Sequence, residues 1–112
     1  MEDDLVAWGR VLRIETTGRR TGRPARATVG YIERGDGVVV AAGSPDADWA
    51  LNLLNDPQCR VTIGDASWDA VARPLDTAEH AAAVRDLILR YGTPAEGLGS
   101  GPAFELRRVA VG

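Results

Sequence analysis

Hydrophobic residues recur along the chain in short β-prone runs that glycine and proline interrupt, a pattern typical of an antiparallel β-protein. The Asp36-Gly37 pair predicts a tight turn that joins two of these runs into a hairpin. The first three strands should therefore form an antiparallel meander. Strands are predicted at residues 10–17, 27–33, 38–40, 60–63, 67–72 and 103–111.

Two segments have helical spacing instead. A short helix is predicted to begin near Ser44-Pro45-Asp46, to be capped by Asp46 or Asp48, and to end at Asn55-Asp56-Pro57. A longer helix is predicted over residues 78–91, directly after Thr77. The residues expected on the apolar faces are Trp49, Leu51, Leu53 and Leu54 in the first helix and Ala82, Leu87, Ile88 and Tyr91 in the second.

The order of these elements indicates the fold class. Six short antiparallel strands and two helices in 112 residues favour a small, mainly β barrel over an open sheet, because closure removes exposed edges. The order is not β-α-β, which argues against a Rossmann domain. A chain of this length forms one domain, residues 1–112. Residues 93–102 are expected to form a surface loop, and Phe104, Leu106 and Val109 are candidate core residues of the last strand.

Charge and hydropathy narrow the function classes. The formal net charge is −3, so nucleic acid is not an expected partner. The apolar runs are too short to span a membrane, and the acidic start is unlike a signal peptide, which predicts a cytoplasmic location. All 13 basic residues are arginine, and six of them lie between residues 10 and 26.

The sequence lacks the usual catalytic and metal-binding sets. His80 is the one histidine and is interpreted as a solvated helix residue, and Cys59 as a small buried apolar residue. No catalytic triad and no metal site is therefore predicted. If the chain is an enzyme, a bound cofactor should supply the chemistry.

The segment from Thr16 to Arg26 is the strongest candidate for ligand binding. Its glycines let backbone N–H groups approach a ligand, its threonines donate hydrogen bonds, and its arginines suit phosphate or carboxylate. The segment does not have the ending of a Walker loop. Composition alone leaves two interpretations open, an anion-binding loop and a solvated basic turn.

The motifs in this half of the chain resemble those of the deazaflavin (coenzyme F-420)-dependent nitroreductase family. In that family, a strand ends in Thr-Thr-Gly-Arg-(Lys/Arg)-(Ser/Thr)-Gly-x-Pro-Arg, and Trp-x-x-Asn-Leu and Asn-Pro follow. The resemblance covers residues 10–75, and Phe104-Glu105-Leu106 resembles the family's closing strand. The matching segments are Thr16–Arg26, Val29-Gly30-Tyr31, Trp49-Ala50-Leu51-Asn52-Leu53 and Asn55-Asp56-Pro57.

This resemblance implies a six-stranded antiparallel split β-barrel with two helices, related to FMN-binding barrels and usually paired as a homodimer. It implies binding of the 8-hydroxy-5-deazaflavin coenzyme, with FMN as a less likely ligand. The arginine segment would meet the coenzyme's anionic tail, and the strand at residues 28–30 would line its ring. The implied cofactor-binding residues are Arg20, Thr21, Arg26, Thr28, Val29, Gly30, Trp49 and Asn52.

The implied function is an oxidoreductase that transfers a hydride from reduced deazaflavin to a quinone, nitroaromatic or enone. The sequence departs from the family pattern at Ala25, at Thr28 and in the shortened segment 41–48. One alternative is therefore a degenerate member that binds deazaflavin, FMN, haem or another small anion without turnover. Another is an interaction domain whose arginine segment meets an acidic partner. No residue is predicted as proton donor.

Overall fold

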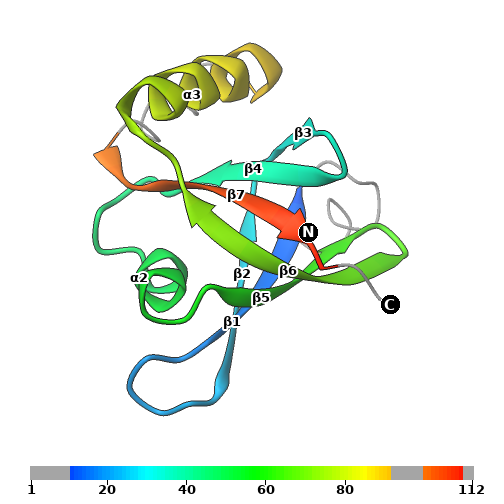
Figure 1. The fold of residues 1–112 in the computed structure, drawn as a ribbon, viewed down its shortest axis with the longest axis vertical. Coiled ribbons are helices and arrows are strands. Elements are labelled where there is room, and N and C mark those ends of the chain that lie inside the picture. Colours follow the sequence, from blue (N-terminus) through cyan, green and yellow to red (C-terminus); the bar gives the residue numbers. More distant parts are fainter. Residues whose placement is uncertain (1–10, 92–99, 110–112) are drawn as a thin grey trace.

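Seven antiparallel strands form one rolled sheet in the computed structural model, which describes residues 11–91 and 100–109 (Figure 1). The strand order is β2-β1-β5-β6-β7-β4-β3, and the helix α2 follows β4 while α3 follows β6. The mainly β split-barrel prediction is confirmed. The strands are β1 (Leu12–Thr17), β2 (Pro24–Val29), β3 (Ile32–Arg34), β4 (Gly37–Ala41), β5 (Gln58–Ile63), β6 (Ala66–Pro74) and β7 (Ala103–Arg108).

The structure has seven strands where six were predicted, because the expected second strand divides at Gly30-Tyr31. Its first part, β2, pairs with β1, and its second part, β3, pairs with β4. These two parts are therefore the two outer strands of the sheet, although only two residues separate them in the chain. The bend between them brings the edges of the sheet together and makes the barrel.

Alternation of side chains along the strands builds the main core. Leu12, Ile14 and Thr16 of β1 are buried, whereas Arg13, Glu15 and Thr17 between them are partly exposed. Phe104 and Leu106 of β7 are fully buried, as predicted. Val109 is 42 % exposed, so its prediction as a core residue was wrong.

The short helix α2 (Asp48–Asn55) covers the ends of β1 and β2. The predicted carboxylate cap is wrong, because the N-cap position is Ala47, which makes no side-chain capping hydrogen bond. The predicted apolar face is partly wrong too: Leu54 is 55 % exposed, and the polar Asn52 is buried. A helix this short buries only one narrow face, and in the structure the buried residues on that face are Ala50, Asn52 and Leu53.

The longer helix α3 (Thr77–Tyr91) packs on the outer side of β3 and β4 (Figure 1). It begins in a capping box, in which the Glu79 N–H donates to Asp76 Oδ1 (2.8 Å) and the Asp76 N–H donates to Glu79 Oε1 (3.2 Å). Ala83 and Leu87 are its buried residues, while the predicted Ala82, Ile88 and Tyr91 are half-buried. Leu87 joins Ala41 and Ala103 in a second, smaller core.

The predicted hairpin is confirmed between β3 and β4, but its turn residues are Gly35 and Asp36 rather than the Asp36-Gly37 pair: Gly35 adopts the positive φ of 60°, and Gly37 is the first residue of β4. Trp68 is half-buried, with the Arg108 guanidinium 4.9 Å from its ring centre. Most of the predicted loop at residues 93–102 lies outside the described residues. Neither described helix is long and apolar enough to cross a membrane.

Candidate functional site

The arginine loop, residues 18–23 between β1 and β2, is held in a compact turn by backbone hydrogen bonds between its own residues. The Gly18 N–H donates to Arg23 O (2.8 Å), and the Gly22 N–H donates to Gly18 O (2.8 Å). A side chain at Gly18 would lie 3.0 Å from Arg23 O, and Gly22 has a φ of 72°. Both glycines are therefore needed for this backbone path.

Asn52 fastens the arginine loop to α2. Its Oδ1 accepts hydrogen bonds from the Arg19 backbone N–H (3.2 Å) and from Arg19 Nη1 (2.9 Å). Its Nδ2 donates to Thr16 Oγ1 (3.1 Å) on β1. The side chain is only 2 % exposed, so its polar atoms depend on these partners. Sequence analysis placed Asn52 against the cofactor, whereas its contacts here position the loop that would hold one.

Arg19 also pairs with the first turn of α2. Its Nη2 lies 3.3 Å from Asp48 Oδ1, and its Nη1 donates to Asp48 O (3.4 Å). Only 24 % of the Arg19 side chain is exposed. The charge of Asp48 is therefore paired with an arginine of the loop, which offsets the unfavourable effect that an acidic residue has near an anionic ligand.

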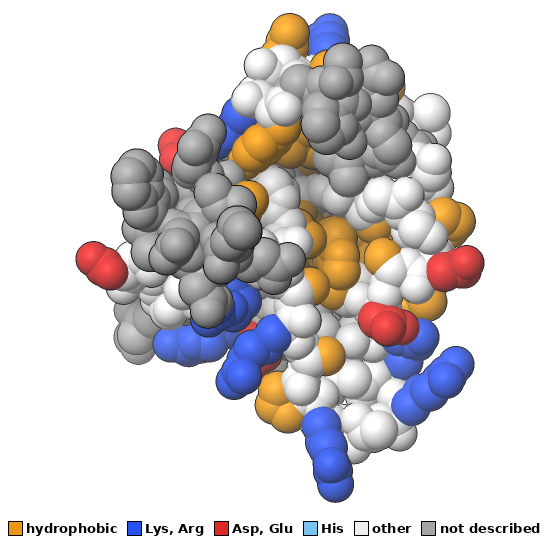
Figure 2. Space-filling view, turned by 180° about the vertical axis from the view of Figure 1, so that it is seen from behind, with side chains coloured by type: hydrophobic (Ala, Val, Ile, Leu, Met, Phe, Trp, Pro, Cys, Tyr) orange, Lys and Arg blue, Asp and Glu red, His pale blue; other side chains and the backbone are white. Residues whose placement is uncertain are grey.

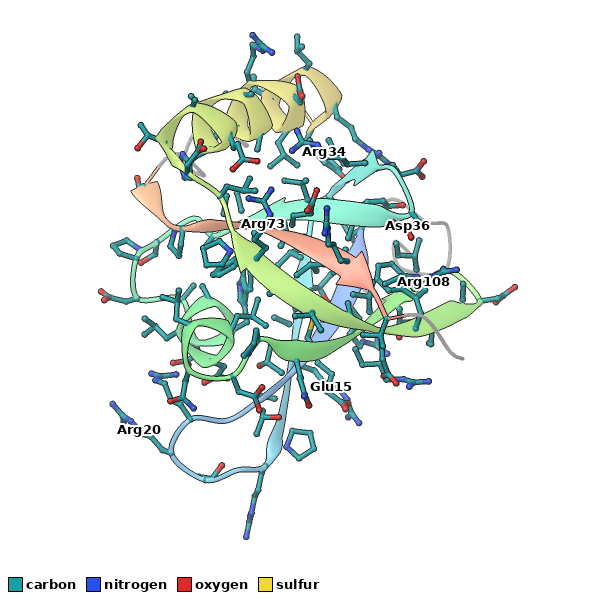
Figure 3. All side chains as sticks on the ribbon, in the orientation of Figure 1. Glu15, Arg20, Arg34, Asp36, Arg73 and Arg108 are labelled. Carbon is teal, nitrogen blue, oxygen red and sulfur yellow. The ribbon has the colours of Figure 1, made fainter. Side chains whose placement is uncertain are left out.

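Arg20 and Thr21 lie at the free end of the loop. Arg20 is exposed and extends away from the barrel (Figure 3). Thr21 Oγ1 accepts a hydrogen bond from the Arg23 N–H (3.2 Å), which leaves the hydroxyl hydrogen available as a donor. With Arg19 committed to Asn52 and Asp48, Arg20 and Arg23 are the exposed arginines of the loop that remain for an anion, and Arg20 is the one that the family motif indicates.

The remaining predicted residues of β2 point to opposite sides of the sheet. Ala27 and Val29 pack at the margin of the main core, while Arg26 and Thr28 alternate with them and face outward. The Arg26 Nε lies 2.9 Å from Glu15 Oε2 on β1. Arg26 and Thr28 therefore do not share a surface with Val29.

Gly30 lies in the bend between β2 and β3, where Tyr91 of α3 holds the backbone. The Tyr91 hydroxyl donates to Tyr31 O (3.0 Å) and accepts from the Tyr31 N–H (3.0 Å). A side chain at Gly30 would meet the Tyr91 ring at 3.1 Å. The Arg90 guanidinium lies 4.7 Å from the Tyr31 ring centre and 5.4 Å from that of Tyr91. Sequence analysis placed Tyr91 on the apolar face of the second helix and did not predict these contacts with the bend.

A hollow with hydrophobic side chains at its centre occupies the back face of the molecule, with arginines along its lower edge (Figure 2). Trp49 of α2 is half-buried at the margin of the main core, with its ring centre 6.1 Å from that of Phe104. Trp49 therefore packs against the main core, while part of its surface stays exposed. An apolar hollow beside basic side chains suits a flat ring that carries an anionic chain.

His80 and Cys59, the two residues most often considered for catalysis, both have structural roles. His80 is half-buried, and its Nε2 lies 2.7 Å from Gly101 O, so its interpretation as a solvated residue was wrong. Cys59 is buried, as predicted. Burial, together with the nearby Asp69 and Asp56, raises the pKa of its thiol to about 12, so it remains protonated at neutral pH.

A family model of the F420H2-dependent quinone reductases matches residues 6–93, most of the chain. The chain belongs to this family. Its cofactor is F420, and the chain is accordingly a deazaflavin-dependent reductase. The match includes the arginine loop, α2 and α3 as far as its last residue.

Solved structures support the fold. The F420H2-dependent reductase FDR-A has a TM-score of 0.72 and 20 % identity, over 88 % of this chain and 94 % of that one. The haem storage protein HutZ from Vibrio cholerae has a TM-score of 0.76 and 20 % identity, over 97 % and 88 %. A haem-binding protein from Mycobacterium smegmatis has a TM-score of 0.72 and 19 % identity, over 96 % of this chain and 50 % of that one.

The residues present fit an F420-type cofactor. The loop offers an exposed guanidinium at Arg20, a hydroxyl at Thr21 and a turn built on two glycines, which are groups that bind phosphate and carboxylate. The apolar hollow offers a surface for a ring (Figure 2). Two residue types that commonly ligate haem iron are engaged otherwise: His80 Nε2 lies 2.7 Å from Gly101 O, and Cys59 is protonated and buried.

Proposed function

We propose that this chain binds reduced F420 with its arginine loop and apolar hollow and passes a hydride to a small organic acceptor. Quinones, nitroaromatics and activated enones form the acceptor class. The observation that carries the proposal is the loop itself: Asn52 and Asp48 fix Arg19, and this arrangement leaves Arg20 exposed at the end of a rigid turn.

The residues of the chain act by positioning. Arg20 and Thr21 hold the anionic tail, and Asn52 keeps the loop against α2 so that the tail enters at a fixed place. Tyr91 fixes the backbone at Gly30-Tyr31, directly after Val29, and we assign this bend to the ring's edge. When bound, the reduced deazaflavin supplies the hydride. The Tyr91 hydroxyl donates to Tyr31 O, so we assign the acceptor's proton to solvent.

A fluorescence titration with oxidised F420 tests the proposal, with FMN and haem titrated in parallel. We expect F420 to bind at micromolar concentration or below and to bind more tightly than FMN or haem. Arg20→Glu should weaken F420 binding by about 10- to 100-fold, because a charge-assisted contact contributes about 1.5–3 kcal/mol. Arg85→Glu, a reversal of another exposed arginine on α3, is the matched control and should not change the affinity.

Turnover is measured with reduced F420 and a set of quinones. Oxidation of the coenzyme that depends on both protein and quinone would support the reductase proposal. Tight binding of F420 without turnover of any acceptor would favour the alternative of a binding protein. Equal affinity in the wild type and Arg20→Glu would overturn the placement of the tail on the loop.

A further inference from the structure

The last turn of α3 holds an arginine against two aromatic rings. The Arg90 guanidinium lies 4.7 Å from the ring centre of Tyr31 and 5.4 Å from that of Tyr91. Both distances are within the range of cation–π attraction, and the Arg90 side chain is still exposed to solvent. The cation is therefore fixed beside the β2–β3 bend, which the last turn of α3 borders (Figure 1).

The charge of Arg90 is not neutralised by these neighbours. Among the residues that the structure describes, no carboxylate forms an ion pair with Arg90, and Asp86, one turn earlier in α3, pairs with Arg85 (3.7 Å). Burial raises the pKa of the Tyr31 hydroxyl above its ordinary value, although Arg90 acts in the opposite direction. The phenol is therefore neutral at neutral pH, so Tyr31 supplies a ring for stacking but no counter-charge.

The backbone of the bend is held without Arg90. The Tyr91 hydroxyl makes both of the hydrogen bonds described above, to the N–H and to the carbonyl oxygen of Tyr31. The Tyr91 ring also lies directly over Gly30. Arg90 therefore adds an oriented positive charge at a place whose backbone position is set by another residue.

A fixed positive charge at the bend matches the charge that the proposed reaction creates. The acceptor gains a hydride from reduced F420 and a proton from solvent, and the coenzyme's second hydrogen leaves to solvent as a proton. A quinone that has received the hydride but not yet the proton is a hydroquinone monoanion, with its negative charge on oxygen. A cation beside the acceptor stabilises this charge as it develops, so the transition state is stabilised more than the neutral quinone.

We propose that Arg90 contacts the oxygen of the acceptor and stabilises the negative charge that hydride transfer places there. This proposal rests on the proposed function, which assigns the bend to the edge of the coenzyme's ring. An acceptor stacked on that ring lies beside the last turn of α3. The planar guanidinium of Arg90 then has N–H groups to donate to an oxygen, while its π face stays against the two tyrosines.

Steady-state kinetics of Arg90→Gln with neutral quinones test this role. We expect kcat/KM to fall by about 10- to 100-fold, because loss of one group that stabilises developing charge lowers rates on the order of 100-fold in a dry site and less in an exposed one. Affinity for F420, measured by fluorescence titration, should change by less than about twofold, since the loop and the bend keep their hydrogen bonds. Arg85→Gln removes the same charge from another exposed position of α3 and should leave both values unchanged.

A series of quinones distinguishes charge stabilisation from a structural role. The loss in Arg90→Gln should be greatest for electron-rich quinones, whose hydroquinone monoanions need the most stabilisation, and smallest for electron-poor quinones. Arg90→Lys keeps the charge without the planar guanidinium, so its loss should be smaller than that of Arg90→Gln. An equal loss for all quinones, or an equal loss in the two variants, would overturn the proposal. Circular dichroism and thermal unfolding establish that each variant is folded.

The same measurements separate this proposal from the proposed function. Absence of F420 binding or of turnover in the wild type would overturn both. Turnover with equal kcat/KM in the wild type and in Arg90→Gln would overturn the role of Arg90 alone. A loss of F420 affinity in Arg90→Gln that accounts for the whole loss in kcat/KM would restrict Arg90 to holding the bend, and would also overturn its contact with the acceptor.

Discussion

The two regions assigned to the cofactor are held in place by different chemistry. A buried amide, Asn52 of α2, holds the arginine loop through three hydrogen bonds. A half-buried phenol, Tyr91 of α3, holds the β2–β3 bend through two hydrogen bonds to one residue and through contact with Gly30. Loss of the Asn52 amide breaks three hydrogen bonds to two segments, the loop and β1, whereas loss of the Tyr91 hydroxyl breaks two hydrogen bonds to the single residue Tyr31. The loop should therefore depend more on its single anchor than the bend does.

Asn52→Ala should have the largest effect. It removes the acceptor of the Arg19 N–H and the partner of Thr16 Oγ1, so we expect a loss of about 2–4 kcal/mol in the free energy of unfolding. The affinity for F420 should fall as well, because the loop loses its attachment to α2. Urea denaturation measures the first effect, and fluorescence titration at a temperature where the variant is folded measures the second.

Asn55→Ala is the matched control, since Asn55 lies in the same helix but is exposed. It should change the free energy of unfolding by less than about 0.5 kcal/mol. If Asn52→Ala were no worse than this control, the description of Asn52 as the anchor of the loop would be incorrect.

Tyr91→Phe should have an intermediate effect. It removes both hydrogen bonds to Tyr31 but keeps the ring over Gly30, so we expect a loss of about 1–2 kcal/mol in stability. If Tyr91 positions the ring-lining backbone, F420 affinity should fall in Tyr91→Phe. An unchanged affinity with reduced stability would restrict Tyr91 to a structural role.

Gly30→Ala separates the two contributions of Tyr91. The new side chain would lie 3.1 Å from the Tyr91 ring, so either the ring or the bend has to shift while the hydroxyl is still present. We expect a smaller stability loss than for Tyr91→Phe but a comparable loss of affinity. Thermal unfolding and fluorescence titration distinguish these outcomes.

Much of this architecture could be predicted from the sequence, because it depends on local patterns. Alternation along β1 and the Asp36-Gly37 signal were enough to place the strands, although the turn itself lies one residue earlier, at Gly35 and Asp36. The division at Gly30-Tyr31 could not be predicted this way, since it depends on β2 and β3 pairing with different strands, β1 and β4, near opposite edges of the sheet. The Asp76-x-x-Glu79 capping box was a local signal that sequence analysis missed.

The site was predicted less completely, because its residues act through contacts between distant segments. The motif located the arginine loop, but nothing in its spacing showed that Arg19 pairs with Asn52 and Asp48, or that His80 meets Gly101. Asn52 was singled out as an amide among leucines, a signal that correctly indicated buried polar contacts. Tyr91 gave no comparable signal, since a tyrosine at the end of a helix is ordinary before the bend is known.

The smallest expected effect is that of Glu79, in the first turn of α3. It tests whether the bend at Gly30 depends on how the helix is attached at the end far from Tyr91. Hydrogen bonds from Arg73, followed by one from the Asp76 backbone, lower the pKa of Glu79 to about 2. The folded state thus binds this proton less tightly than the unfolded state does. Stability from Glu79 is present above pH 4.5 and is lost as the pH falls towards 2.

Glu79→Gln should therefore reduce stability slightly at pH 7 and make the curve of stability against pH flatter between pH 5 and 2. Glu33→Gln, at an exposed residue of β3, serves as the control. Urea denaturation across this pH range measures both. If Glu79→Gln also lowers F420 affinity, the attachment of the start of α3 helps to hold the bend, through Tyr91 at the other end of the helix. If affinity is unchanged while stability falls, the Tyr91 contacts hold the bend independently of how the helix begins.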